Sequence, residues 1–336
     1  MRPEEEFGAE LSLLRQSSYF DEEYYYQERP DVKNAGVDAA YHYFFQGWKE
    51  RANPSDKFCT AMYLSTNSAQ ICPLVDYERN GCQGDYSFRG ALDDEIANYH
   101  YYRRYQLPWN STACYTYISK GYDSLILHRH IVYDWDYICF TDDDDLIKQR
   151  YVGIWKIRPA LERRFDAKRN SGWHKTHPEK CCRFYKNSVW IDGNVNVISP
   201  YLYREILMRN SVILVPEHYE RDCIYDECEK IRELGCDSAE NCDAAIEFLR
   251  RENMPQHYGL NETNIVFRKH GNNLVRKVDE IWWKCIKKYS KRDQASFSYA
   301  LFKNRIYPQR IALLNTRTNS GDFLVIKHTK SKTETL

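Results

Sequence analysis

The sequence lacks several features that would place it in a specialised class. No apolar run approaches the roughly 18 residues that a membrane-spanning helix needs. Lys plus Arg and Asp plus Glu number 48 each, so there is no basic excess of the kind that nucleic-acid-binding proteins show. The amino terminus, Met1 to Glu6, is acidic and has no apolar signal-peptide core. We therefore expect a cytoplasmic protein, free or peripheral at the inner membrane face, with no nucleic-acid partner.

Paired cysteine motifs are also missing. The 12 cysteines include no C-x-x-C pair, and without a signal peptide we expect thiols rather than disulfides. One local cluster contains residue types that zinc accepts: His174, His177, Cys181 and Cys182. Two vicinal cysteines rarely both reach one tetrahedral ion, but a structural zinc site stays open as an alternative.

The 336 residues suffice for one large or two smaller domains. We expect a helical module over 1–57, a linker or embellishment over 58–110, an α/β domain over 111–311 and a polar tail over 312–336. Within the first part, Phe20-Asp21, Pro30-Asp31-Val32, His42-Tyr43 and Gly47-Trp48 resemble a small helical module of bacterial surface-polysaccharide enzymes. This resemblance implies a compact unit over residues 18–57 that could dock on a partner.

From Cys114 onward, strands and helices alternate. Apolar residues at three-to-four spacing predict helices over 223–234, 241–251 and 278–289. Short apolar runs predict strands over 114–118, 136–141, 152–157, 188–197, 211–215 and 264–270. Strands separated by helices indicate an α/β sheet.

The stretch from Ser188 to Val197 has the pattern of a buried strand that ends in a turn and then resumes. Asp192 follows the apolar run, Gly193 permits a sharp turn or close approach of a ligand, and Asn194 supplies a second oxygen. Two oxygens at a strand end can hold a divalent cation, which in turn can hold a diphosphate. A plain β-turn with an Asx hydrogen bond is the structural alternative.

Ordered motifs from residue 114 to about 304 carry a second resemblance. They are Gly121-Tyr122-Asp123, Asp136-Tyr137-Ile138-Cys139-Phe140-Thr141-Asp142-Asp143, Trp155-Lys156-Ile157, Lys175-Thr176-x-Pro178, Trp190-Ile191-Asp192-Gly193-Asn194, His218-x-x-Arg221-Asp222, Arg268-x-His270, Trp282-Trp283 and Arg292-Asp293-Gln294.

This order of motifs resembles the TOD1/MUCI70-type glycosyltransferase-like family, formerly a domain of unknown function. The resemblance implies a GT-A-like fold, as in nucleotide-diphospho-sugar transferases, with a mixed sheet flanked by helices. It also implies a nucleotide-sugar donor, a glycan or polysaccharide acceptor and a divalent cation, Mn²⁺ or Mg²⁺, at an acid-x-acid-like site. One departure is Glu179, since the family usually has histidine after the proline.

The resemblance assigns the metal to Asp192, Asn194 and His270, so that Asp192 also takes part in catalysis. Asp293 is a candidate general base for an acceptor hydroxyl, with capping of the next helix as the alternative. A lone histidine such as His270 is more often an ordinary hydrogen-bonded residue.

Further candidates would bind the substrate. They are Asp123, Asp142, Lys175, His218, Arg221, Arg292, Gln294 and Trp283. Lysine and arginine suit a diphosphate, aspartate at a strand end suits ribose or metal, and tryptophan can stack on a sugar ring. Helix capping, a solvated loop, a salt bridge between helices and core packing are the structural alternatives.

The sequence is consistent with two functions. The first is a metal-assisted glycosyltransferase. The second is a non-catalytic nucleotide- or glycan-binding protein that retains the transferase fold, which the neutral Asn194 and the altered loop at Glu179 leave possible.

Overall fold

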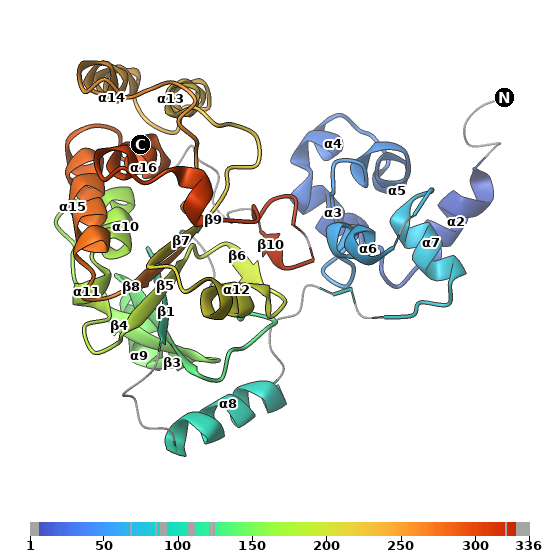
Figure 1. The fold of residues 1–336 in the computed structure, drawn as a ribbon. Helices are drawn as coiled ribbons and strands as arrows, with labels where there is room; N and C mark the ends of the chain where they lie inside the picture. Colours follow the sequence, from blue (N-terminus) through green and yellow to red (C-terminus); the bar gives the residue numbers. More distant parts are fainter. Residues whose placement is uncertain are drawn as a thin grey trace. The chain divides into compact units, whose positions relative to one another are not determined.

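The computed structural model describes residues 7–67, 69–84, 86–87, 93–105, 112–120, 122, 125–319 and 321–326. The chain forms two units, Met1–Gly90 and Ala91–Leu336 (Figure 1). None of the helices in the described ranges is both long enough and apolar enough to cross a membrane.

The first unit is helical. Its described helices are α2 (Gly8–Gln16), α3 (Glu22–Glu28), α4 (Pro30–Asn34), α5 (Ala39–His42) with the π-helical turn η1 (Tyr43–Gly47), α6 (Thr60–Thr66) and α7 (Pro73–Arg79). Asp21 begins α3 by accepting a hydrogen bond from the Tyr24 amide at 2.9 Å, and such a cap satisfies an otherwise unpaired amide.

The core of the first unit extends beyond residue 57, where the sequence analysis ends its helical module. Leu14, Tyr25 and Tyr43 are buried together with Phe58 and Leu74, which both lie in the segment expected to be a linker, residues 58–110. Residues 58–79 therefore belong to the same hydrophobic core, and residues 18–57 do not form a separate compact unit.

Among the described residues of the second unit, eight strands form one mixed sheet in the order β3-β4-β2-β1-β5-β8-β7-β9. The strands are β1 (Thr112–Ile118), β2 (Trp135–Thr141), β3 (Tyr151–Val152), β4 (Trp155–Pro159), β5 (Asn187–Ile191), β7 (Ile213–Pro216), β8 (Ile265–Lys269) and β9 (Ala312–Leu313). Strand β1 pairs in parallel with both β2 and β5, whereas β8 runs antiparallel to β5. Every residue of β1 is buried, as expected for a strand covered on both faces.

The predicted strand over 188–197 divides at its turn. Strand β5 ends at Ile191, and β6 (Val195–Val197) pairs with β10 (Phe323–Val325) in a separate small sheet. The described part of the predicted tail is therefore built into the second unit, since β9 joins the main sheet and β10 pairs beside the turn.

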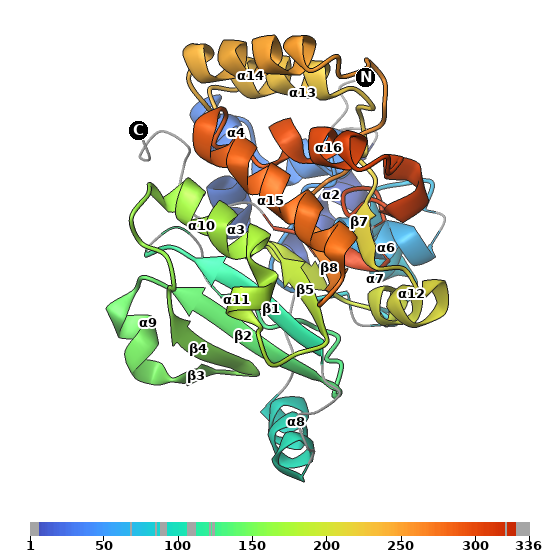
Figure 2. The same cartoon turned by 60° about the vertical axis from the view of Figure 1, so that its left-hand side comes forward.

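Helices cover both faces of the main sheet. Their bounds are α8 (Asp93–Tyr105), α9 (Asp144–Gln149), α10 (Ala167–Thr176), α11 (Pro178–Cys181), α12 (Tyr201–Arg209), α13 (Ile224–Glu233), α14 (Ala239–Arg251), α15 (Asn273–Lys288), α16 (Gln294–Lys303) and the 3-10 turn η3 (Pro308–Ile311). Helices α10, α15 and α16 lie together on one face (Figure 2), where Trp282 and Phe297 pack on Trp190 of β5. Leu202 of α12 and Tyr99 of α8 join the core on the opposite face.

The predicted α/β class, a mixed sheet flanked by helices with a helical N-terminal part, is thus confirmed. Helices α13 and α14 form an outer pair that packs against α15 and α16 through a further apolar cluster.

A buried ion pair joins β8 to α15. Arg268 is fully buried, and its Nε donates to Asp279 Oδ1 at 3.0 Å. Because an arginine cannot lose its charge, Asp279→Ala leaves a buried cation unpaired and should lower the free energy of unfolding by about 3–5 kcal/mol in chemical denaturation.

The double variant Arg268→Met/Asp279→Leu is the matched control, because it removes both charges and fills the space with apolar atoms. It should regain most of the lost stability. A double variant as unstable as Asp279→Ala would show that shape, rather than the unpaired charge, causes the loss.

Candidate active site

A cavity of about 560 Å³ opens at the carboxyl ends of β1 and β5. In the sheet, β2, β4 and β3 lie on one side of β1, whereas β5 lies on the other side. The strand order therefore reverses between β1 and β5. Ligands of open α/β sheets gather at such points, because the loops diverge there and leave a crevice. The position and size of the cavity are therefore those of a ligand site.

The cavity is lined by residues from separate parts of the second unit. They are Tyr117, Ser119 and Tyr122 at and after the end of β1; Asp166, Ala167, Lys168 and Ser171 in the first part of α10; Trp190, Asp192, Gly193 and Asn194 around the end of β5; Gly235 and Cys236 between α13 and α14; Glu262, Thr263 and Asn264 before β8; Lys291, Arg292, Asp293 and Gln294 at the start of α16; and Arg317, Val325 and Ile326.

A lysine between two carboxylates lies at this cavity. Lys175 Nζ is 2.9 Å from Asp192 Oδ1 and also contacts Asp293 Oδ2. The Lys175 side chain is 4% exposed, that of Asp293 is 11% exposed and that of Asp192 is 32% exposed. Asp192 therefore presents the more accessible carboxylate, whereas Asp293 and Lys175 lie beneath the surface.

Neighbouring groups hold both carboxylates in place. Trp190 Nε1 donates to Asp192 Oδ1 at 2.6 Å, and Thr263 Oγ1 donates to Asp293 Oδ2 at 2.8 Å. Lys175 Nζ also lies 5.2 Å from the centre of the Trp190 ring, within cation–π range. These contacts join β5, α10 and the start of α16 at one point.

The charges of this group stabilise one another. Burial lowers the pKa of Lys175, but Asp192 and Asp293 raise it more, so its pKa lies above the usual lysine value. Burial raises the pKa of Asp293, but Lys175, Lys168 and Arg292 lower it more, and the net pKa lies well below the usual aspartate value. Asp293 is therefore a firmly ionised carboxylate and a weak proton acceptor.

Four cations of the described residues line the cavity: Lys168, Lys291, Arg292 and Arg317. Burial and the nearby Arg292 lower the pKa of Lys168 to about 8. The Nε of Arg292 is buried and has no hydrogen-bond partner among the described residues. By contrast, two of the lining carboxylates are already paired, Asp166 with Arg169 and Glu262 with Arg317. The cavity thus combines accessible positive charge with the Asp192 carboxylate.

The three residues assigned to a metal do not converge. Strands β5 and β8 are antiparallel, so Asn264 lies beside Asp192, whereas His270 lies at the far end and bonds to Ser188 at 2.9 Å. Ser188 and Asp192 are separated by roughly 13 Å of extended strand at about 3.3 Å per residue. The prediction that His270 binds a metal ion together with Asp192 is therefore wrong.

Asn194 serves the local fold. Its side-chain amide donates to the Ile326 carbonyl at 3.0 Å, and its own carbonyl accepts from the Ile326 amide at 2.8 Å, so it holds β10 beside the turn. In the described part of the chain, no three His, Cys, Asp or Glu side chains are grouped so that they could hold a metal ion. With Lys175 bonded to both nearby carboxylates, these residues do not fit a divalent cation.

Other predicted binding residues lie outside the cavity lining. Asp142 accepts from Tyr117 Oη at 2.9 Å and from the Lys120 amide at 2.7 Å, and thereby ties the ends of β1 and β2 together. Trp283 lies in a shallow hollow beside Phe165, on another surface of α15. Neither side chain lines the cavity, and their roles as substrate contacts stay predictions. Asp123 lies outside the described residues.

His218 and Arg221 form a local network that does not line the cavity. Arg221 Nε donates to Glu227 at 2.9 Å, and His218 Nδ1 accepts from the Arg221 amide at 2.9 Å. The three-residue spacing of His218 and Arg221 brings their side chains together, as expected. They belong to a salt-bridge network with Glu227 and do not line the cavity.

The candidate zinc ligands His174 and Cys181 are engaged in hydrogen bonds within the protein. His174 Nδ1 bonds to the Asn170 carbonyl at 2.7 Å, and its Nε2 accepts from the Leu161 amide at 2.9 Å, so neither ring nitrogen is available to a metal. Cys181 Sγ donates to the His174 carbonyl. The four zinc candidates therefore pack within the fold.

Among the predicted site residues, Asp192, Asn194, Arg292, Asp293 and Gln294 line the cavity, and Lys175 contacts two of them. Four lining residues were not predicted: Lys168, Lys291, Glu262 and Arg317. Lys168 follows the helix-capping Asp166, a signal that could have placed it at a helix start beside a strand end. No comparable local signal marks Arg317, which reaches the cavity from the predicted tail.

A mixed sheet with a polar cavity at its strand-order reversal defines an α/β protein with a candidate ligand site. A family model, the TOD1/MUCI70 glycosyltransferase-like domain, matches residues 129–321. This match covers more than half of the chain, and the chain belongs to that family. The resemblance noted in the sequence is thereby confirmed.

Two solved structures show distant similarity. The WbbM bifunctional glycosyltransferase in its apo form is 11% identical with a TM-score of 0.38, and the match covers 90% of this chain and 62% of that one. Mouse xyloside xylosyltransferase 1 in its apo form is 9% identical with a TM-score of 0.34, covering 61% of this chain and 84% of that one. The chain thus spans 62% of the length of WbbM. No curated protein matches the sequence.

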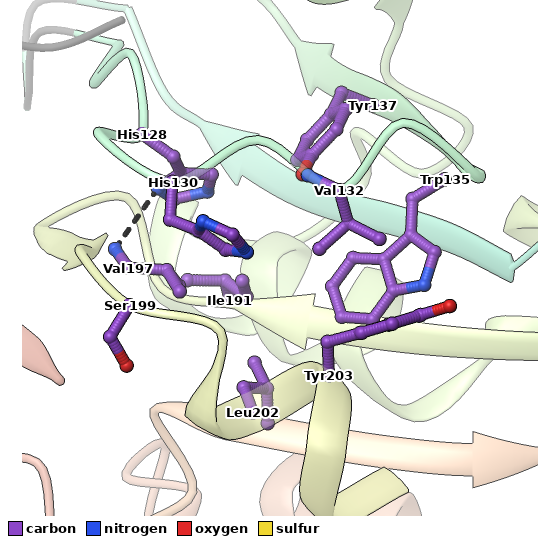
Figure 3. A pocket seen from close by; sticks show the side chains of 10 residues that line it. All are labelled: His128, His130, Val132, Trp135, Tyr137, Ile191, Val197, Ser199, Leu202 and Tyr203. Atoms are coloured by element: carbon purple, nitrogen blue, oxygen red, sulfur yellow. Dashed lines mark hydrogen bonds between the residues drawn. The ribbon is translucent and has the colours of Figure 1, made fainter. Parts of the chain in front are cut away.

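A second hollow lies on the opposite face of the sheet, beside α12 (Figure 3). It encloses no volume that a water molecule could occupy. His128 Nδ1 accepts from the Val197 amide at 3.3 Å, while its buried Nε2 has no partner among the described residues. Burial, and to a smaller extent His130, lowers the pKa of His128 to about 3, so this ring is neutral in the folded protein.

The neutral His128 predicts a loss of stability in acid. The pKa is about 6.5 in the unfolded chain and about 3 in the folded chain, so only the unfolded chain takes up this proton between those values. The free energy of unfolding should fall as the pH decreases from 6.5 toward 3, by up to about 1.4 kcal/mol per pH unit from this group. His128→Gln should show a smaller decrease between pH 7 and pH 5 in urea denaturation.

The matched control is His257→Gln. His257 is exposed, and its hydrogen bond to Asp222 raises its pKa, so its removal should not flatten the acid dependence. The same pH dependence in wild type and His128→Gln would refute the assignment.

Proposed function

We propose that the second unit is a glycosyltransferase that moves a sugar from a nucleotide-sugar donor to a glycan or polysaccharide acceptor. The observation that carries this proposal is the 560 Å³ cavity at the ends of β1 and β5, which combines the Asp192 carboxylate with Lys168, Lys291 and Arg292. Membership of a glycosyltransferase-like family supports it. A GT-A-like arrangement of donor and acceptor is part of the same proposal.

The lining cations would hold the donor diphosphate. Glycosyl transfer releases a nucleoside diphosphate, so negative charge grows on that group as the bond to the sugar breaks. Fixed cations stabilise such charge most when they are oriented before the reaction. Arg292 is suited to this role because its buried Nε has no hydrogen-bond partner in the described part of the chain and its guanidinium can bind two phosphate oxygens.

Asp192 is the better candidate for the general base. Its side chain is partly exposed in the cavity, whereas Asp293 is buried and its pKa is held low. In this role Asp192 takes the proton of an acceptor hydroxyl, whose oxygen bonds to the anomeric carbon. The electron pair of the breaking bond passes to the diphosphate. Asp293 then acts by positioning Lys175, which contacts Asp192.

The alternative is a non-catalytic nucleotide- or glycan-binding protein with the same cavity. It shares ligand binding with the transferase and differs only in turnover. A docking role of residues 18–57 stays a prediction, now within the larger first unit.

The first test is nucleotide release from a panel of UDP-, GDP-, ADP- and CDP-sugars. We expect the purified chain to release the nucleotide of one donor class. Asp192→Asn should lower turnover by about 10²–10⁴-fold and leave binding of the same nucleoside diphosphate within a few-fold, because the base acts only on the reacting hydroxyl.

The control for that test is Lys148→Met. Lys148 is exposed on α9 and pairs with Asp145, so turnover should be unchanged. Nucleotide binding without release from any donor would favour the binding protein, and absence of both would refute the transferase.

A second test asks whether Arg292 and Lys168 each contribute to binding of the diphosphate. Arg292→Met and Lys168→Met should each weaken nucleoside diphosphate binding by about tenfold in isothermal titration calorimetry, because each removes a charge-assisted contact to phosphate. Lys148→Met again serves as the control. Unchanged affinity in both cavity variants would place the diphosphate elsewhere.

A further inference from the structure

Two carboxylates from distant parts of the chain converge on one cation. Asp192 follows β5 and Asp293 precedes α16, and both contact the Nζ of Lys175 on α10. The point where they meet borders the cavity that would hold a donor diphosphate. A site of two carboxylates beside a diphosphate is where a divalent cation would be expected.

The ammonium at this point is held firmly. The Lys175 side chain is 4% exposed, and its Nζ also faces the Trp190 ring. One oxygen of each carboxylate has a second partner besides Lys175, since Asp192 Oδ1 also accepts from Trp190 and Asp293 Oδ2 also accepts from Thr263. A divalent cation would have to displace the lysine or approach it against charge repulsion.

We infer that the Lys175 ammonium takes the place of a divalent cation and that Lys168, Lys291 and Arg292 bind the donor diphosphate without a metal ion. This inference rests on the proposed function and deepens it. The protein side of the site supplies fixed positive charge through four basic side chains, of which Lys175 also neutralises the two carboxylates.

This arrangement has a direct consequence for ligand binding. A nucleoside diphosphate that contacts basic side chains alone should bind equally well with chelator and with Mn²⁺. One that is bridged to Asp192 by a metal should need the metal.

The first experiment is isothermal titration calorimetry of UDP, GDP, ADP and CDP with the full chain, once in EDTA and once in Mn²⁺. We expect the nucleotide that binds to have the same dissociation constant in both conditions, within about twofold. Tightening by Mn²⁺ of about tenfold or more would overturn the inference and leave the transferase proposal intact. Binding of no nucleotide in either condition would overturn both.

The second experiment removes the lysine. In Lys175→Ala the two carboxylates face each other without a counter-charge, so the variant should gain a Mn²⁺ site that the wild type lacks. Electron paramagnetic resonance of free Mn²⁺ would measure the gain, and Mn²⁺ should raise the melting temperature of Lys175→Ala alone. If that variant folds poorly, recovery of its folding by Mn²⁺ is the readout.

Two variants control this experiment. Lys175→Arg keeps a cation between the carboxylates and should not bind Mn²⁺, and Lys148→Ala removes an exposed lysine of the same unit and should behave as wild type. A wild type that binds Mn²⁺ as tightly as Lys175→Ala would overturn the inference. A Lys175→Ala variant that neither binds Mn²⁺ nor is stabilised by it would also overturn it.

Discussion

The contact of Lys175 with Asp192 and Asp293 is the interaction on which the second unit depends most. It links α10, the end of β5 and the start of α16, which are far apart in sequence. Each of these charges would be unfavourable in the protein interior by itself, and together they are stabilised by mutual attraction and by the hydrogen bonds of Trp190 and Thr263. The walls of the cavity are thereby held in position.

The same interaction gives the two carboxylates different properties. Asp293 is buried and firmly ionised, whereas Asp192 keeps an exposed side in the cavity. A difference in environment between two neighbouring acids often separates a positioning role from a chemical role. The cations Lys168, Lys291 and Arg292 add the complementary charge that a diphosphate requires.

The sequence predicted most of the elements around this site. The apolar runs at 114–118, 136–141 and 264–270 correspond to β1, β2 and β8, because strands buried on both faces need continuous apolar sequence. The run at 188–197 contains β5, and Asp192 and Asn194 were found because they follow its apolar residues. His270 was misplaced because a strand pattern does not show in which direction the strand runs, and β8 is antiparallel to β5. Trp283 does not line the cavity, because helical spacing does not show which surface its ring meets.

The sequence by itself determined the approximate positions of most strands and of three helices, the family, and the set of chemical groups near the turn at Asp192 to Asn194. Only the tertiary structure decided which of these groups meet. The pairing of Lys175 with two carboxylates, and the contribution of Lys168, Lys291 and the chain around Val325 to one cavity, depend on strand order and helix packing. Contacts between residues more than a hundred positions apart leave no local periodicity, since they arise from how complete elements pack in space.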